Sequence, residues 1–320
     1  MNQSSPPEEP STELLDDVAG AVGAEVTLLG RLPGGANGGA VRVQLAGSTD
    51  AVLKAVPRAH PGHLDETLRA QRVVEHMRGR GYPTPAWLGA GATATHVWHL
   101  TDFVDAAPAA ELTPSLVEQL MEIVELQAGQ GSEPYDHWSY AWRAATGVEP
   151  AVAGPEFSET PEQARLRRSI ARLSGYSDAV STLVERLRLA CADVPAPREA
   201  PDMVHADLST PGNVLVRDGA VVAVVDIGNA GSGTRAIDLT TLVWYSFQDP
   251  LLDDVRRRLW TKVLDLVGGE GAAVLTAAHV LHMLEVPVRE GRRDGVPGVV
   301  ERGHRALDEL RALRSSRAWR

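Results

Sequence analysis

The stretch MVHADLSTPGNVLVRDGAVVAVVDIGNAG, residues 203–231, surrounds a run of valines with polar residues. Within it, the pair Asp218-Gly219 separates the alternating segments NVLVR and AVVAVVD. An Asp-Gly pair between two such segments is a strong signal of a β-hairpin with a two-residue turn. The stretch therefore predicts a hairpin with polar side chains at its open end, where a carboxylate needs a partner to hold it.

A two-residue turn pairs Arg217 with Ala220, and it therefore pairs Asn213 with Val224. Asp226 then lies diagonally across the hairpin from Asn213, with about 7 Å between the side-chain origins. An amide and a carboxylate that converge in this way suit a hard cation such as Mg²⁺, which takes oxygen ligands and leaves positions for phosphate. The hairpin therefore predicts a cation site at its open end.

A third polar group, the carboxylate of Asp207, precedes the hairpin in the same stretch. From the loop before the hairpin it can orient a hydroxyl group. Phosphoryl transfer requires this arrangement, in which metal ligands lie on one side of the phosphate and a carboxylate positions the attacking group on the other. The residues thus indicate phosphoryl transfer before any family is considered.

The segments HADLSTPGN, VVD and AIDL, in this order, resemble the catalytic core of the aminoglycoside phosphotransferase and choline kinase family, which is related to protein kinases. The resemblance implies an α+β, protein-kinase-like bilobal fold, with a small β-rich N-terminal lobe and a larger, mainly helical C-terminal lobe. The expected division is a disordered tail over 1–11, a nucleotide-binding lobe over 12–104, and a catalytic and acceptor-binding lobe over 105–320.

The resemblance also implies a role for each polar residue of the opening stretch. Asp207 is the expected catalytic base, and His205 is expected to brace its loop. Asn213 and Asp226 are the expected Mg²⁺ ligands, and Asp238 is expected to support the catalytic loop from the start of the next helix. One departure is the distance from Asp207 to Asn213, which is one residue longer than in the family, so the loop is expected to bulge.

The nucleotide, ATP or GTP, is expected in the N-terminal lobe. The turn LPGGANGGAVRV, with Gly34 and Gly35, lies between predicted strands and can fold over phosphates through its backbone N–H groups. Lys54 ends an alternating strand where the family has a phosphate-binding lysine, and the chain contains only one other lysine. The adenine is expected on backbone groups of a hinge segment that includes Thr101 and Phe103.

In the family, the phosphate-binding lysine has an acidic partner on the helix that follows. Aligned on the PTP motif after that helix, the position of the glutamate falls near Ala70 or Gln71, neither of which is acidic. Helical periodicity places Glu66 on the apolar face together with Ala70, and it places Glu75 on the opposite face. We therefore expect Glu66 to be the partner of Lys54, while Gln71 or no partner at all are the alternatives.

The acceptor pocket is expected in the helical lobe, with acidic side chains for a cationic acceptor and aromatic walls. Its candidate residues are Asp136, Trp244, Asp253 and Glu285. Three acceptors fit: an aminoglycoside or other basic antibiotic (and hence antibiotic resistance), an amino-alcohol such as choline, or a natural-product intermediate. One alternative hypothesis is a non-catalytic nucleotide-binding pseudokinase. Another is a zinc site at His279, His282 and Glu285, but no second motif supports that zinc site.

Composition limits the partners. The 31 basic and 42 acidic residues give a net charge of −11, which disfavours a nucleic-acid binder and suits a cationic small molecule. The single cysteine, Cys191, cannot form an internal disulfide, and the N-terminus lacks the order of a signal peptide. No uninterrupted apolar run reaches the length of about 18 residues typical of a membrane span. We therefore expect a cytoplasmic monomer or homodimer.

The pattern of the chain changes near residue 112. The first hundred residues predict strands and turns, with one helix over 63–79. Thr113 and Pro114 suit an N-cap and a first helical position, and apolar residues with helical spacing follow them. Beyond this point the sequence predicts mostly helix, interrupted by the hairpin.

Overall fold

The structure, a computed structural model, describes residues 9–32, 40–47, 49–148, 161–170, 172–198, 200–208 and 212–316. It divides into two compact units. One unit contains the chain up to Glu111 together with residues 210–228, and the other contains residues 112–209 and 229–320. Each unit is described by itself.

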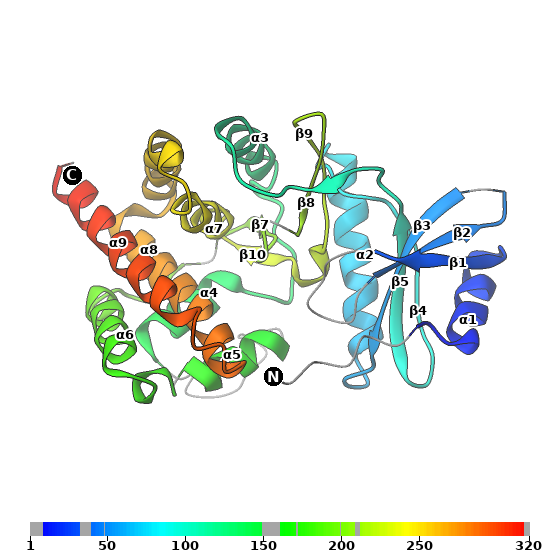
Figure 1. Cartoon of the computed structure of the whole chain (residues 1–320), viewed down its shortest axis with the longest axis horizontal. Helices are drawn as coiled ribbons and strands as arrows, with labels where there is room; N and C mark the ends of the chain where they lie inside the picture. Colours follow the sequence, from blue (N-terminus) through cyan, green and yellow to red (C-terminus); the bar gives the residue numbers. More distant parts are fainter. Residues whose placement is uncertain are drawn as a thin grey trace. The chain divides into compact units, whose positions relative to one another are not determined.

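The first unit is built around a five-stranded antiparallel sheet (Figure 1). The strand order is β1-β2-β3-β5-β4. Their bounds are Val26–Arg31 (β1), Ala40–Leu45 (β2), Thr49–Pro57 (β3), Trp87–Ala92 (β4) and His96–Asp102 (β5). The sheet confirms the strands predicted for the first hundred residues, and successive side chains along each strand point to opposite faces of the sheet.

One face of this sheet packs against helix α1, Thr12–Val22, which is not among the elements predicted from the sequence. Leu14 and Val18 of α1 join the sheet residues in one apolar cluster. The helix begins at Ser11, whose hydroxyl accepts the N–H of Leu14 at 3.2 Å. The end of the predicted disordered tail is therefore a helix cap, and residues 1–8 lie outside the described chain.

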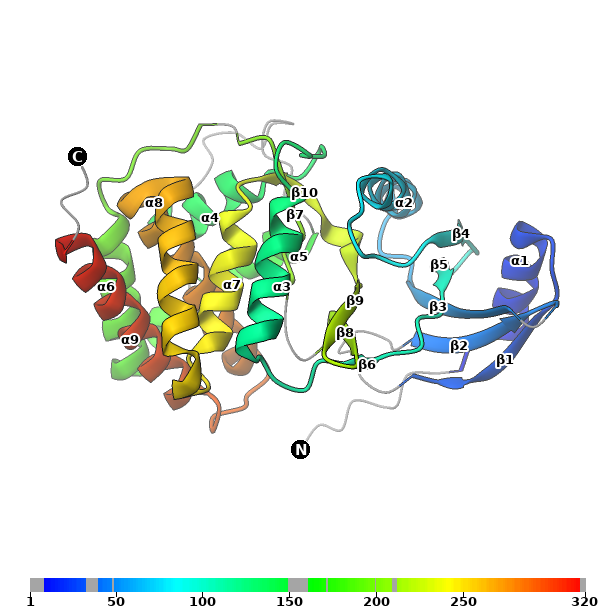
Figure 2. The same ribbon diagram turned by 90° about the horizontal axis from the view of Figure 1, so that it is seen from above.

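The other face of the sheet packs against helix α2 (Figure 2). This helix runs over His63–Gly79 and confirms the prediction for 63–79. Ala70 is buried on its inner face, and Glu75 is exposed, as helical periodicity predicts. Because Leu53 points toward α1, its neighbour Lys54 points toward the α2 face.

The predicted hairpin is present as β8, Val214–Arg217, and β9, Ala220–Val224. Its turn at Asp218-Gly219 has positive φ at both residues, and Arg217 pairs with Ala220 as predicted. The predicted pairing of Asn213 with Val224 is wrong. The register shifts between Leu215 and Val216, so Val224 faces Val214 instead. An extra residue in β9, which is a β-bulge, causes the shift.

The first unit continues past residue 104, the predicted end of the N-terminal lobe. Strand β6, Ala107–Pro108, pairs with β8 of the hairpin. Ala109 also donates its N–H to the carbonyl of Val214 at 2.8 Å. These bonds tie the segment after the hinge to the hairpin, which is why the hairpin groups with the sheet.

The second unit is mainly helical, as predicted. Its helices are α3 (Pro114–Glu125), α4 (His137–Thr146), α5 (Pro161–Ile170), α6 (Asp178–Cys191), α7 (Ala236–Ser246), α8 (Asp253–Arg289) and α9 (Val296–Ser316). Short 3₁₀ turns lie at Leu173–Gly175 and Pro250–Leu252, and two short strands, β7 (Asp202–Val204) and β10 (Gly231–Gly233), pair beside α4. Thr113 caps α3 by accepting the N–H of Leu116 at 3.2 Å, which confirms the predicted start.

Helix α8 forms the centre of the second unit and contacts α4, α6, α7 and α9. It is long and apolar enough to span a membrane, but 67% of its apolar window is buried inside the fold, as in the core helix of a globular unit. Gly268 interrupts it with φ 67°, which divides it into two helical halves. Helix α9 runs along α8, and α7 packs on the same core helix (Figure 1).

Candidate active site

The loop that carries Asp207 is held by the first turn of α7 in the second unit. Asp238 accepts the N–H of His205 at 2.8 Å and the N–H of Ala206 at 3.1 Å. Ala206 has φ 68°, a left-handed conformation that a residue with a side chain adopts only when its surroundings hold it. Asp238 thus lies at the start of α7 and contacts the loop that it is predicted to support.

His205 is fully buried beneath this loop. Its Nδ1 accepts the backbone N–H of Asp207 at 3.2 Å, which assigns the ring proton to Nε2. The buried imidazole therefore holds the backbone of Asp207, the expected base. Asp207 itself is exposed, as a group that meets a substrate must be.

Sequence reasoning did not find one further residue that donates a hydrogen bond to Asp238. The side chain of Gln127, just after α3, donates to Asp238 at 3.0 Å. Burial raises the pKa of Asp238, while His205, Gln127 and Ala206 lower it through their charge or N–H donors. The three N–H donors favour the ionised form of this carboxylate, and burial opposes them. No local motif marks Gln127, because it reaches Asp238 only in the folded chain.

Asp226 follows β9 and has φ 64°, which turns its carboxylate away from the strand direction. The N–H of Val225 donates to the carbonyl of Asn213 at 2.9 Å, so the predicted ligands Asn213 and Asp226 lie one residue out of register at the open end of the hairpin. Both offer oxygen donors. Among the described residues, no group of three or more His, Cys, Asp and Glu side chains could hold a metal ion.

This pair of donors fits Mg²⁺ better than it fits a metal bound by protein alone. Mg²⁺ keeps several waters and binds through one or two protein ligands together with substrate phosphates. An amide oxygen and one half-exposed carboxylate are such a set. The same observation disfavours the zinc site at His279, His282 and Glu285, which are absent from any such metal-binding group in the described chain.

Lys54 and Asp226 meet in the first unit. The Nζ of Lys54 donates to Oδ1 of Asp226 at 2.6 Å. The side chain of Lys54 is 26% exposed and that of Asp226 is 44% exposed. The expected phosphate-binding lysine and the expected metal ligand are therefore in contact and open to solvent on one side.

The expected pair of Lys54 with Glu66 is not formed. Glu66 instead lies 3.5 Å from the Nε2 of His60, in the segment before α2. Glu66 is half-buried, as its place on the helix predicts, but it lies in the first turn of α2. The residue one turn further on is Ala70, which is buried and has no acid to offer. Asp226 takes the place of the helix acid.

His99 lies opposite Lys54 in the pairing of β3 with β5, and sequence reasoning missed it. Its ring stacks on Trp87 with 4.1 Å between centroids and an interplanar angle of 9°. Burial and the charge of Lys54 lower the pKa of His99 to about 4, although Asp226 opposes this shift. The histidine is thus neutral at pH 7 and adds no positive charge beside the lysine.

In the hinge segment, the side chain of Phe103 contacts Arg42. The ring centroid of Phe103 lies 4.0 Å from the guanidinium carbon of Arg42. The backbone N–H of Phe103 donates to the carbonyl of Asp50 at 3.2 Å. The hydroxyl of Thr101 has a weak contact of 3.4 Å with the carbonyl of Asp102. Among the described residues, the N–H of Val104 has no acceptor, so this backbone donor is available to a base.

Several expected features lie outside the described residues. Gly34 and Gly35 belong to the segment 33–39, and the expected bulge of the catalytic loop falls within 209–211. Their predicted roles stay predictions.

The acidic residues expected in the acceptor pocket all have other partners. Asp136 is the N-cap of α4 and accepts the N–H of Ser139 at 3.0 Å. Asp253 bonds to Arg256 at 2.7 Å. Glu285 is fully buried and accepts from the side chain of Arg289 at 2.9 Å.

Trp244, the fourth acceptor candidate, is buried in α7 with an exposed fraction of only 2%. It therefore cannot be an open wall of a pocket. These residues have structural roles because helix caps and buried ion pairs depend on contacts that the sequence pattern does not reveal.

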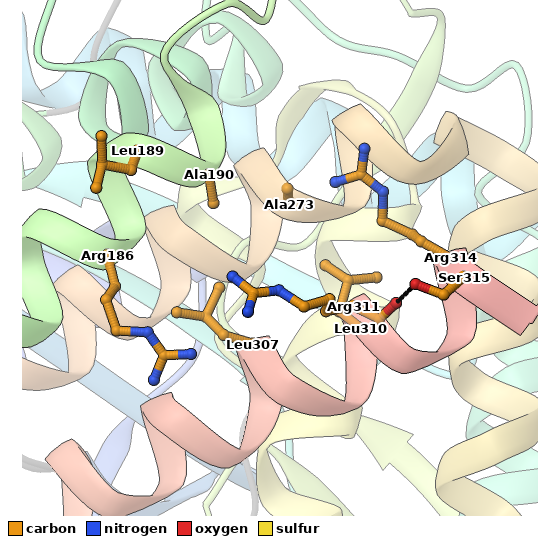
Figure 3. Close-up of a pocket in the computed structure, with 9 residues that line it drawn as sticks. All are labelled: Arg186, Leu189, Ala190, Ala273, Leu307, Leu310, Arg311, Arg314 and Ser315. Carbon is orange, nitrogen blue, oxygen red and sulfur yellow. Dashed lines mark hydrogen bonds between the residues drawn. The ribbon is translucent and has the colours of Figure 1, made fainter.

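A cavity of about 530 Å³ in the second unit contains none of the predicted site residues (Figure 3). It lies between α6, α8 and α9, and its charged lining is Arg186, Arg311 and Arg314. In the first unit, a groove of about 660 Å³ includes Phe103 and Val104 of the hinge, together with hairpin residues. Of the two, only the groove includes predicted nucleotide contacts.

Comparison with known proteins agrees with this geometry. The model of the phosphotransferase enzyme family (APH) matches residues 29–273. The chain belongs to this family. It is a small-molecule phosphotransferase with a protein-kinase-like fold, and the resemblance seen in the sequence is confirmed. No curated protein matches the chain.

Solved structures support the fold of this phosphotransferase. A putative fructosamine-3-kinase from Thermobifida fusca is 25% identical, with a TM-score of 0.57 over 94% of this chain and 100% of that one. A thermostable aminoglycoside phosphotransferase APH(4)-Ia, in complex with ADP and hygromycin B, is 16% identical, with a TM-score of 0.60 over 93% and 98%. Macrolide 2′-phosphotransferase MphH from Brachybacterium faecium is 17% identical, with a TM-score of 0.51 over 91% and 97%.

Proposed function

We propose that this phosphotransferase moves the γ-phosphate of a nucleoside triphosphate to a hydroxyl group of a small molecule, with Asp207 as the catalytic base. The observation that carries the proposal is the fixed position of the Asp207 loop. Asp238 accepts the N–H groups of His205 and Ala206, and the His205 ring accepts that of Asp207, so the backbone that leads to this exposed carboxylate is held. A base held in this way loses little freedom when it accepts the proton of an acceptor hydroxyl.

Asn213 and Asp226 would hold Mg²⁺ together with the nucleotide phosphates, and the ion would supply charge neutralisation at the transferred phosphate. Lys54 would pair with the phosphates, since its ammonium already donates to the carboxylate of Asp226, which would hold the ion. The N–H of Val104, which has no acceptor among the described residues, would bind the base of ATP or GTP. These roles are supported by contacts within the first unit alone.

The acceptor is a hydroxylated small molecule. Similar proteins are named for an aminoglycoside, a macrolide and a fructosamine, which supports a sugar-like or antibiotic acceptor. A cationic acceptor needs free carboxylates, and the three acids expected for it are engaged elsewhere. A regulatory pseudokinase without turnover is less well supported, because the described contacts hold the backbone of Asp207.

The test is a screen of the purified protein with ATP or GTP and Mg²⁺ against aminoglycosides, macrolides, amino-alcohols, sugars and hydroxy acids. Mass spectrometry would detect an acceptor that gains one phosphoryl group. Transfer to at least one class, absent without nucleotide, is the expected result. Nucleotide binding without transfer to any acceptor class would favour the pseudokinase.

A further inference from the structure

The side of α7 that faces the Asp207 loop continues beyond Asp238. Tyr245 lies two helical turns after Asp238, and residues with this spacing share one face of a helix. Tyr245 is half-buried and near Asp207, since burial and the charge of Asp207 both raise the pKa of its phenol. The expected base and the Tyr245 ring therefore lie on the same side of the second unit.

Arg302 reaches the same place from α9. Its guanidinium carbon lies 4.8 Å from the ring centroid of Trp244, the neighbour of Tyr245. Its charge lowers the pKa of Tyr245, opposite to the effect of Asp207. Tyr245 thus lies within the influence of both an anion and a cation.

Arg302 differs from the buried Arg256 and the half-buried Arg235 of this unit. Arg256 bonds to Asp253 and Glu309, and Arg235 bonds to Glu125 and Asp202. In the part of the chain that the structure describes, no carboxylate lies within ion-pair distance of Arg302. Burial lowers the pKa of Arg302, and the charges of Tyr245 and Glu301 oppose this shift only in part. A desolvated cation without a carboxylate is costly, and binding an anion would remove that cost.

The residues around Arg302 have further unused polar atoms. The Nε1 of Trp244 and the Nε2 of His279 are buried and have no hydrogen-bond partner among the described residues. The two rings lie 5.5 Å apart at an angle of 59°. Buried polar atoms are nearly always paired in folded proteins, so unpaired ones indicate a missing partner.

We propose that Tyr245 and Arg302 form the acceptor-binding surface beside Asp207, and that Arg302, which lies over the buried Trp244 ring, binds an anionic oxygen group of the acceptor, a carboxylate or a phosphate. The inference rests on the proposed role of Asp207 as the base. It replaces the expected cationic acceptor with one that carries a negative charge beside its reactive hydroxyl. Arginine suits this task because its planar fork matches both groups.

The experiment compares matched acceptors in the wild-type protein and in Arg302→Gln. The probes are gluconate, glucose and glucosamine, which share a carbon skeleton, and glycerate, glycerol phosphate and glycerol. Initial rates of phosphate transfer give kcat and KM for each. We expect the anionic member of each set to be used at least tenfold better than its neutral or amino counterpart. Carboxylate and phosphate probes in one set distinguish the two sources of charge.

In Arg302→Gln the preference should fall at least tenfold, mostly through KM, and Arg302→Lys should recover part of it. The matched control is Arg305→Gln on the same helix, whose guanidinium lies 5.2 Å from the Phe247 ring. It should keep the preference of the wild type. A preference for neutral or amino acceptors, or an equal preference in Arg302→Gln, would overturn the inference.

Calorimetric titration of glycerate and glycerol phosphate, without nucleotide, separates the two proposals. If the wild type binds an anion that Arg302→Gln no longer binds, and no acceptor is phosphorylated, the anion site is retained and the proposed function is overturned. If the wild type phosphorylates neutral acceptors but binds neither anion, the proposed function is retained and the anion site is overturned. Circular dichroism confirms that each variant is folded.

Discussion

Lys54 donates to Asp226 over 2.6 Å, although the two residues are 172 positions apart. The lysine comes from the sheet strand β3, and the aspartate comes from the end of the hairpin. Both side chains are partly open to solvent, so the pair contributes little to stability. The ion pair instead positions two functional groups, because it holds the expected phosphate-binding lysine next to the expected metal ligand.

Lys54→Met should therefore affect function far more than stability. The free energy of unfolding should change by less than about 1 kcal/mol, as is usual for a partly exposed ion pair. Nucleotide affinity should fall by about 1.5–3 kcal/mol, the usual value of a hydrogen bond to a charged group. Calorimetric titration with nucleotide and urea unfolding measure the two quantities. A large loss of stability with unchanged affinity would assign the lysine to the fold.

Glu66→Gln should have little effect, in contrast to the expectation from the sequence. Its partner is His60, and the side chains of both are about one-third exposed. Nucleotide affinity and stability should each stay within about 0.5 kcal/mol of the wild type. Glu75→Gln, on the exposed face of α2, is the matched control. If Glu66→Gln weakened nucleotide binding and the control did not, Lys54 would have to exchange Asp226 for Glu66 when nucleotide binds.

Asp226→Ala should remove the Mg²⁺ dependence of nucleotide binding and abolish turnover. Asn213→Ala should be milder, because a neutral amide contributes less to a cation than a carboxylate does. Titrations with and without Mg²⁺ compare the two variants. Unchanged metal dependence in Asp226→Ala would exclude this residue as a ligand.

Asp207→Asn should lower kcat by about a hundredfold or more, since general-base catalysis contributes about that much. Nucleotide affinity should stay near the wild-type value. Asp254→Asn is the control, because Asp254 is an exposed carboxylate paired with Arg257. Near-normal turnover in Asp207→Asn would remove it from the role of base.

His279 predicts a pH dependence of stability. Burial and the charges of His282 and Arg302 lower its pKa from 6.5 to about 3. Because the folded pKa is the lower one, the unfolded chain takes up the proton first as the pH falls. The contribution of His279 is complete above about pH 6.5 and is lost as the pH falls toward about 3.

For one such histidine, the free energy of unfolding should fall by roughly 2 kcal/mol between pH 7 and pH 5. His279→Gln should remove this part of the pH dependence, whatever its effect at pH 7. Urea unfolding of both proteins at the two pH values gives the comparison. An equal loss in the variant would show that His279 is not the group responsible.

The sequence by itself determined the features that depend on neighbouring residues. The Asp218-Gly219 turn follows from two residues that accept positive φ, and the start of α3 follows from the Thr113 cap. Helix α2 follows from apolar spacing within one segment. The family could also be inferred, because its motif lies in a single stretch of chain.

Only the tertiary structure decided which distant side chains meet. The bulge in β9 moved Asn213 out of its predicted register, and Asp226 rather than Glu66 became the partner of Lys54. Gln127 and Arg302 carry no local signal, because their neighbours come from other helices. Such contacts depend on how whole elements pack, and packing is the sum of many weak long-range interactions that no short pattern contains.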